Sequence, residues 1–279
     1  MTQQIDVSHF TPVEQTAFVT LYAKALDSKS SRPILGDHQA DRTATRIDYD
    51  FDDLGVVTSV VCQSSLRAKM LDDRARRFVA ANHTAVVLDL GAGLDDARSR
   101  VQPPDGVDWY NIDLPAVLAV RDTVLPDAPQ NHSIPVDLTE SNWAAAIPKD
   151  RPAFLRADGL FAFLDEQTIV KIFRGITDHF ESGELAFNDY GRIGWVSRAA
   201  VRLAPQKMFG AVGGLYGYPG FKDAHHPQNW NPKLRLVEET SLATQPEVDL
   251  FPTPLRVSTR LAAHVPAMAR KARILLYRF

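Results

Sequence analysis

The stretch that decides the fold reads Ala85-Val-Val-Leu-Asp-Leu-Gly-Ala-Gly-Leu-Asp-Asp96, an apolar run that stops at two glycines. It predicts a buried strand that leads into a ligand-binding turn. Gly91 and Gly93 have no Cβ, so the backbone can turn sharply there and its N–H groups can approach a ligand. Open α/β folds bind their cofactors at such turns, at the carboxyl edge of a parallel sheet. An ordinary tight strand-to-helix turn is the alternative, because glycine turns alone are weak signals.

Two classes of ligand compete for this turn. A dinucleotide site calls for a third glycine at position 96 and for room beside the helix start for a pyrophosphate. This chain has Asp95 and Asp96 there, and a close pair of like charges costs roughly 4 kcal/mol at intermediate dielectric. S-adenosylmethionine carries a positive sulfonium and hydroxyls that can donate to carboxylates. The turn therefore favours S-adenosylmethionine, and a nicotinamide-dependent oxidoreductase is the rival enzyme class.

The composition is that of an ordinary globular protein. The 279 residues are 45% hydrophobic and 23% charged, enough for one core or for a core with a cap. A net charge of −3 provides no overall field that would attract nucleic acid or an anionic membrane. The first residues lack a signal-peptide pattern, no apolar run could cross a bilayer, and Cys62 is the single cysteine. We expect a cytoplasmic protein without nucleic-acid, membrane or metal partners.

The chain divides into two parts by its hydrophobic pattern. Residues 1–81 show mostly helical spacing and predict an N-terminal helical cap, in which the charged segment 41–53 is expected to be an irregular surface loop or a lid. In residues 82–279, strands alternate with turns and helices, which predicts a doubly wound, mostly parallel α/β sheet with a lid insertion at about 190–232. Strands are expected at 85–90, 107–113, 132–137, 152–158, 184–189, 234–239 and 272–279, with Pro135 placing the third toward an edge.

Acidic residues follow the predicted strands on the side where the glycine turn opens. Because parallel strands align their carboxyl ends, these acids should converge on one crevice. Asp113 lies at the chain distance where a carboxylate reaches ribose hydroxyls, and Asp137 could accept from an adenine amino group while Leu138 packs on the ring. A helix N-cap or a turn is the alternative role for any one acid. The set comprises Asp89, Asp95, Asp113, Asp137 and Asp158.

Four motifs occur in a fixed order along the chain: Val86-Val-Leu-Asp-Leu-Gly-Ala-Gly-Leu-Asp95, Trp109-Tyr-Asn-Ile-Asp-Leu-Pro115, Val136-Asp-Leu138 with Trp143, and Ala157-Asp-Gly-Leu-Phe-Ala-Phe-Leu164. Together they resemble the leucine carboxyl methyltransferase family, and within it the bacterial polyketide-synthesis O-methyltransferases. The resemblance extends from the helix that holds Ser65–Asp72 to the last strand. It implies a class I methyltransferase (Rossmann-like) fold with an antiparallel last strand, S-adenosylmethionine as cofactor and S-adenosylhomocysteine as product.

The resemblance also implies roles for single residues. Arg67 matches the family arginine that holds the cofactor carboxylate, and the two glycines match the family's turn. Asp113 would bind the ribose, Asp137 with Leu138 the adenine, and Asp158-Gly159 stands where the family has Glu-Gly. The complete expected cofactor set is Arg67, Asp89, Gly91, Gly93, Asp95, Asp113, Leu114, Asp137, Leu138, Asp158 and Gly159.

Two departures from the family concern the methyl acceptor more than the cofactor. The family has Leu-Asp-Thr-Arg after the glycines, whereas this chain has Leu94-Asp-Asp-Ala97 with Arg98 one place late. Phe163 replaces the tyrosine of the family's Met-Tyr-Leu and so lacks its hydroxyl. If these groups orient the acceptor in relatives, the acceptor differs here. A member that binds the cofactor without methylating is a further alternative.

Methyl transfer from a sulfonium is an in-line displacement that demands alignment and the exclusion of water. A carboxylate acceptor, with a pKa of about 4, is already ionised, whereas a phenol near 10 needs a base. The leading hypothesis is therefore an O-methyltransferase that forms a methyl ester on a small, polyketide-like acid or a peptide terminus, with phenol or hydroxyl methylation as the alternative. His225 and His226 are the candidate bases, unless they are exposed loop histidines.

Candidate acceptor contacts are arginines that could anchor a carboxylate and aromatic residues that could form the walls of a pocket. Each has a plain alternative as a surface or packing residue. The pattern does not define the oligomeric state. The candidates are Arg46, Phe163, Tyr190, Arg192, Trp195 and Tyr216, with Tyr218 as a further aromatic wall.

Overall fold

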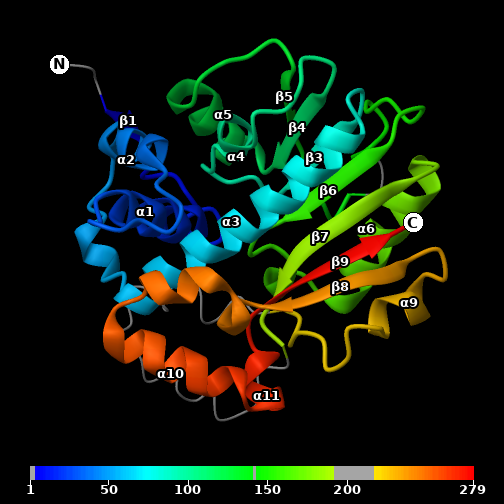
Figure 1. Cartoon of the computed structure of the whole chain (residues 1–279). Coiled ribbons are helices and arrows are strands. Elements are labelled where there is room, and N and C mark those ends of the chain that lie inside the picture. The colour runs from blue at the N-terminus through cyan, green and yellow to red at the C-terminus, as the bar shows by residue number, and fades with distance from the viewer. Residues whose placement is uncertain (1–3, 141–142, 192–216) are drawn as a thin grey trace.

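The computed structural model describes residues 4–140, 143–191 and 217–279. In these residues, a seven-stranded sheet with the order β5-β4-β3-β6-β7-β9-β8 forms the centre of the molecule (Figure 1). Strands β3 to β7 pair in parallel, and β9 is antiparallel to both β7 and β8. The predicted doubly wound fold and its antiparallel last strand are confirmed. The strands are β3 (Val86–Leu90), β4 (Asp108–Asp113), β5 (Asn131–Pro135), β6 (Ala153–Ala157), β7 (Gly183–Asp189), β8 (Arg235–Ser241) and β9 (Arg273–Arg278).

Strand β3 is the central element, and all five of its residues are buried. Alternate side chains enter opposite cores because successive residues of a strand face opposite sides. Leu88 belongs to the core under α6 (Glu166–His179), and Val87 belongs to the core under α3 (Thr58–Ala81) and α4 (Ala97–Val101). The two covered faces explain why the strand is apolar on both sides apart from Asp89.

The strand order reverses direction beside β3. The chain moves from β3 to β4 and β5 on one side, and then returns to β6 on the other side. Ligands of open α/β sheets bind outside the carboxyl ends of the strands at such a reversal. The crevice is therefore expected between the ends of β3 and β6. As Pro135 predicted, β5 is an edge strand.

The N-terminal elements pack around a core of their own at one end of the sheet (Figure 1). Phe18 and Leu21 of α1 are buried there together with Val117 and Val120 of α5. The N-terminal elements of this core are β1 (Ile5–Asp6), α1 (Thr16–Ser28), α2 (His38–Thr45), β2 (Ile47–Asp48) and η1 (Asp52–Leu54). The later helix α5 (Pro115–Val124) completes it. The division into a cap of residues 1–81 and a core stays a prediction, because α3 also packs on the sheet.

The expectation for residues 41–53 was wrong. The segment begins inside α2, continues as β2 in parallel pairing with β1, and buries Ile47 and Phe51. The reason is an alternation of period two, in which Ile47, Tyr49 and Phe51 face the core and aspartates lie between them. This short period was hidden by the high charge of the segment.

The remaining helices lie near the C-terminal strands. They are α9 (His226–Trp230), η3 (Leu242–Thr244), η4 (Pro246–Leu250), α10 (Thr253–Ala263) and α11 (Pro266–Ala269), and η2 (Phe161–Phe163) follows β6. Within the described ranges, no helix combines the length and apolar character that a membrane span requires.

Candidate functional site

The glycine turn after β3 has the tight geometry that its sequence predicts. Gly91 has φ of 65° and Gly93 has φ of 54°, in the left-handed region that favours glycine. The Gly91 N–H donates to the carbonyl of Ile112 at 2.8 Å. A Cβ on Gly91 would lie 3.1 Å from Cδ1 of Leu160, so the backbone conformation favours glycine and a larger residue would press on Leu160.

Asp113, the last residue of β4, points toward this turn. Its Oδ2 accepts from the Gly93 N–H at 2.7 Å, and its Oδ1 accepts from the Leu114 N–H at 2.7 Å. Burial raises the pKa of Asp113, and the two amide donors act in the opposite direction. Each carboxylate oxygen has two lone pairs, so one on each oxygen is left to accept from a hydroxyl.

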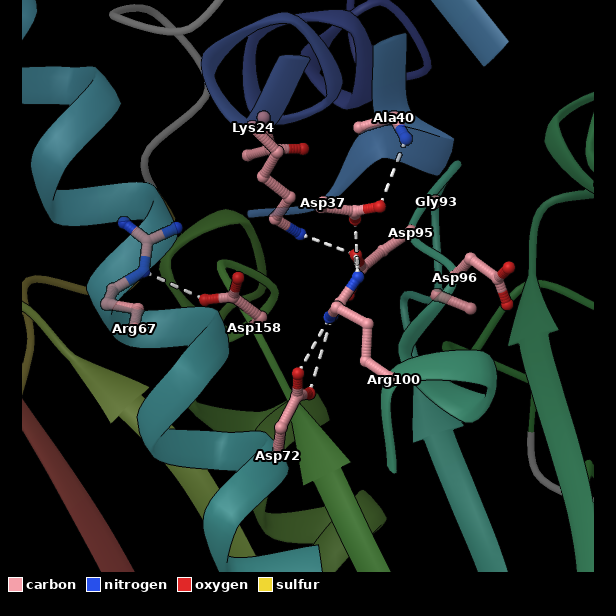
Figure 2. Close-up of polar contacts among 12 residues, drawn as sticks. Lys24, Asp37, Ala40, Arg67, Asp72, Gly93, Asp95, Asp96, Arg100 and Asp158 are labelled. Atoms are coloured by element: carbon pink, nitrogen blue, oxygen red, sulfur yellow. Dashed lines mark hydrogen bonds and ion pairs between the residues drawn. The ribbon is translucent and has the colours of Figure 1, made fainter. Parts of the chain in front are cut away.

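Arg67 and Asp158 form an ion pair on the other side of the turn (Figure 2). Nε of Arg67, from α3, donates to Oδ1 of Asp158 at 2.8 Å, and the guanidinium carbon lies 5.4 Å from the centre of the Tyr190 ring. Burial acts to raise the pKa of Asp158, but Arg67 and Lys24 outweigh it and hold the pKa below its ordinary value. The end of β6 therefore presents an ionised carboxylate beside a cation.

A group of buried ion pairs joins the N-terminal helices to the glycine turn (Figure 2). We call Lys24, Asp37, Asp72, Asp95 and Arg100 the cap-side cluster. Arg100 donates to Asp37 at 2.6 Å and to Asp72 and Asp95 at 2.7 Å each. Lys24, whose side chain is 3% exposed, lies 2.8 Å from Asp95. The cluster thereby connects α1, the start of α2, α3 and α4.

Asp89 and Asp95 both contact cations of the chain itself. Arg156 donates to Asp89 at 3.2 Å, yet burial is the larger effect and raises the pKa of Asp89 to about 6. Burial also acts to raise the pKa of Asp95, but Arg100 and Lys24 outweigh it and hold that pKa well below its ordinary value. A role for either residue in cofactor binding stays a prediction.

Asp95 and Asp96 are not free negative charges beside the ligand, contrary to the expectation from the sequence. Asp95 is balanced by Lys24 and Arg100, and Asp96 caps α4 by accepting from the Ser99 N–H at 3.4 Å. The capping alternative therefore holds for Asp96, and the choice of cofactor rests on the other residues of the crevice.

Asp113, Asp137 and Asp158 lie at or just beyond the carboxyl ends of three strands, as predicted. Asp137 is exposed, and its Oδ1 accepts from the Thr139 N–H at 2.8 Å in a local turn. Leu138 is buried in the core. Gly159, with φ of 78°, donates its N–H to Oδ1 of Asn188.

A small pocket opens where β6 and β7 end. Asp189 in its wall accepts from Nε of Arg273 at 2.8 Å and from the Phe221 N–H at 3.1 Å. Burial raises the pKa of Asp189, and Arg273 opposes that effect. Of the predicted acceptor residues, Tyr190 lines this pocket, as does Tyr218. The other lining residues are Phe161, Ala162, Asn188, Asp189, Gly220 and Phe221.

Two of the other predicted acceptor residues, Arg46 and Phe163, do not line this pocket. Arg46 donates to the carbonyls of Thr123 and Val124, at the end of α5 that lies away from the glycine turn. Phe163 is half-buried in η2. Arg192, Trp195 and Tyr216 lie outside the described residues.

The two candidate bases lie at the start of α9. His225 is exposed, and its Nδ1 is 3.1 Å from Oε1 of Gln228. The His226 ring packs against Trp230 at 4.8 Å and against Phe221 at 6.3 Å between ring centres. Neither histidine forms an ion pair with a carboxylate in the described ranges.

Sequence reasoning missed Asn188 and the cations of the cap-side cluster. Asn188 had the same signal as the acids, a polar residue at the end of a predicted strand, but the prediction considered only carboxylates. Arg100 and Lys24 had no such signal, because most of their partners come from segments distant in sequence.

The sequence profile of the leucine carboxyl methyltransferase family matches residues 7–177. The tetracenomycin polyketide synthesis O-methyltransferase TcmP of Streptomyces glaucescens is 32% identical over 270 residues, which cover 96% of this chain and 97% of that protein. An S-adenosyl-L-methionine-dependent methyltransferase of Gibberella zeae is 28% identical over 207 residues, 66% of this chain and 68% of that protein.

Solved structures share the fold at low sequence identity. Magnesium protoporphyrin IX methyltransferase from Synechocystis PCC 6803, with bound S-adenosylhomocysteine, is 12% identical with a TM-score of 0.50, over 90% of this chain and 99% of that chain. A methyltransferase dependent on S-adenosylmethionine from Anabaena variabilis is also 12% identical, with a TM-score of 0.51 over 76% of this chain and 82% of that chain. The sheet is therefore that of the class I methyltransferases.

Proposed function

The chain belongs to the leucine carboxyl methyltransferase family, and from this premise we propose that it forms a methyl ester on the carboxylate of a small aromatic, polyketide-like acid. It is an O-methyltransferase that uses S-adenosylmethionine. The polyketide part of the proposal is supported by TcmP, which is named for tetracenomycin polyketide synthesis and aligns with nearly the whole chain. A peptide terminus is the other carboxylate that the family's name suggests.

The residues of the crevice fit the cofactor. S-adenosylmethionine supplies an electrophilic methyl group on a positively charged sulfur. In the proposal, Arg67 holds its carboxylate, Asp158 its ammonium group, and Asp113 its ribose hydroxyls. This assignment is supported by the Arg67–Asp158 pair, which offers one charge of each sign, and by the open lone pairs of Asp113.

The observation that favours a carboxylate acceptor is that the described residues of the pocket wall offer no available base. Asp189 is engaged by Arg273 and by the Phe221 N–H, and the described wall includes neither His225 nor His226. A carboxylic acid is ionised at neutral pH and needs no base, whereas a phenol must lose a proton. The chain then has only to align the acceptor and to exclude water.

A cytoplasmic location is part of the same proposal. Burial of the single cysteine, Cys62, raises the pKa of its thiol to about 11, so it is an inert buried side chain. A lone buried cysteine is compatible with a reducing compartment. The proposal needs no partner besides the acceptor acid.

The test uses methyl-labelled S-adenosylmethionine with matched aromatic probes: benzoate and phenol, 2-naphthoate and 2-naphthol, and anthraquinone-2-carboxylate with its hydroxyl counterpart. Mild alkali releases methanol from a methyl ester and leaves an ether intact. We expect alkali-labile label on at least one acid and none on its phenol partner. Alkali-stable label on a phenol, or transfer to no probe, would contradict the proposed acceptor class.

A further inference from the structure

Asn188, the penultimate residue of β7, is held in one orientation. The residue is 5% exposed and lines the pocket, and its Oδ1 accepts from the Gly159 N–H. A backbone N–H can only donate, so the atom that faces it must be the amide oxygen. This contact fixes which end of the amide is which, a choice that coordinates alone leave open. The NH2 end therefore points away from Gly159.

The NH2 end meets no hydrogen-bond acceptor among the described residues. Nδ2 of Asn188 is buried and has no hydrogen-bond partner in the described part of the chain. Buried donors are nearly always paired, because an unmade hydrogen bond leaves the cost of desolvation uncompensated. An unpaired donor in a pocket wall therefore calls for an acceptor atom on a bound molecule.

The position in the sheet identifies which molecule that is. β7 lies two strands from β3 and three from β4, at about 4.8 Å per strand, so Asn188 is remote from Asp113. Four rings line the pocket around it, those of Phe161, Tyr190, Tyr218 and Phe221. The pocket thus matches an aromatic acceptor rather than the adenosine half of the cofactor.

Charge considerations favour a carboxylate at this position. Arg273 lies 2.8 Å from Asp189 and compensates the negative charge of that carboxylate in the pocket wall. Oδ1 of Asp189 accepts from the Phe221 N–H. The Asn188 amide is a donor at this end whatever the pH, since it does not titrate. A hydrogen bond to an ionised oxygen is stronger than one to a neutral oxygen.

Building on the proposed function, we infer that Nδ2 of Asn188 donates to the acceptor carboxylate at the oxygen that is not methylated, which makes Asn188 a specificity-determining residue for aromatic carboxylic acids. The other carboxylate oxygen forms a bond to the methyl carbon as the carbon–sulfur bond breaks. The electron pair of that bond stays on sulfur, and no proton moves.

Asn188→Asp tests the inference, since it keeps the oxygen that faces Gly159 and replaces only the donor. Asn131→Asp is the matched control: Oδ1 of Asn131 also accepts a hydrogen bond, from Asn111, but at the amino end of β5. With the panel acid that the wild type methylates fastest, Asn188→Asp should raise KM about 100-fold. The new carboxylate repels the acceptor carboxylate, which the wild-type amide binds by a hydrogen bond. The Kd for S-adenosylhomocysteine should change less than about twofold in both variants, and Asn131→Asp should keep the wild-type KM.

Asn188→Ala removes the donor without adding charge and decides the matter if Asn188→Asp does not fold. We expect its KM for the same acid to rise about 10-fold, the loss of one hydrogen bond to a charged group. An unchanged KM in the folded variants, or a loss that falls on the Kd for S-adenosylhomocysteine, would overturn the inference. A wild-type enzyme that methylates no acid of the panel would instead refute the proposed function, and this inference with it.

Discussion

The two sides of the glycine turn satisfy their buried polar groups in opposite ways. In the cap-side cluster, each of the five charged side chains has an ion-pair partner from the chain, and Arg100 alone serves three carboxylates (Figure 2). In the pocket at β6 and β7, the amide donor of Asn188 has no partner among the described residues. We conclude that charges next to a glycine turn can be structural. Other buried polar atoms of the described residues also lack a partner, Asp96 Oδ2 among them, and Asn188 differs from them because it lines a pocket that a ligand can enter.

There is a physical reason why every charge of the cap-side cluster is paired. A buried charge is costly unless it is paired, and removal of one partner leaves the others uncompensated. Because its members come from α1, the start of α2, α3 and α4, the pairs also fix the N-terminal helices against the turn. The geometry at Gly93 therefore depends on residues that touch no ligand in the proposal.

The largest expected effect is on stability. Arg100→Met should lower the free energy of unfolding by about 3 to 5 kcal/mol, since Asp37, Asp72 and Asp95 lose their shared cation. Arg77→Met is the control: Arg77 is 62% exposed and pairs with Glu238 at the surface, where the loss should stay below about 1 kcal/mol. Urea unfolding measures both. Equal losses would mean that the cluster is not structural.

The next effect concerns binding. Arg67→Gln should raise the Kd for S-adenosylhomocysteine about 100-fold, or about 2.7 kcal/mol, because a charged bidentate donor to the cofactor carboxylate is lost. Isothermal titration calorimetry at low temperature measures this in the folded variant, with Arg77→Met again as the control. A Kd within threefold of the wild type would remove Arg67 from the cofactor site.

A third effect separates two carboxylates by pH. Asp89 has its pKa raised to about 6 by burial, so between about pH 4 and pH 6 the folded protein holds a proton that the unfolded chain has released. Its contribution to stability is therefore largest at low pH and falls as pH rises through this window. Asp95 has a lowered pKa, so its contribution to stability is present at higher pH and is lost as the pH falls.

Asp89→Asn removes the first titration alone. Relative to the wild type, its free energy of unfolding should improve from pH 4 to pH 7 by up to about 3 kcal/mol, at about 1.4 kcal/mol per pH unit. Urea unfolding at both pH values gives the difference. A difference that is constant, or that worsens with pH, would show that Arg156 rather than burial controls Asp89.

Much of the fold could be predicted because its signals are local. The apolar run before Gly91 marked the central strand, and the acids after it marked the carboxyl edge of the sheet. The alternation of Ile47, Tyr49 and Phe51 was equally local, but it was hidden among aspartates. The ion pairs of Arg100 could not be predicted, because the partners are brought together only by the folded chain.

The site divides in the same way. Sequence order was enough to place Asp113 and Asp158 at the carboxyl ends of two strands of one sheet, and the structure adds their contacts. The sequence could not show that Asp95 forms ion pairs with Lys24 and Arg100. Nor could it show that Nδ2 of Asn188 lacks a partner among the described residues. Both facts depend on which side chains surround a group in space.

The most direct test of this contrast is a crystal structure of the enzyme with S-adenosylhomocysteine and the preferred aromatic acid of the panel. The account predicts an acid oxygen within hydrogen-bond distance of Nδ2 of Asn188, ribose hydroxyls on Asp113, and unchanged ion pairs between Arg100 and its three carboxylates. Either ligand bound to Arg100, or an acid whose carboxylate lies away from Asn188, would contradict it.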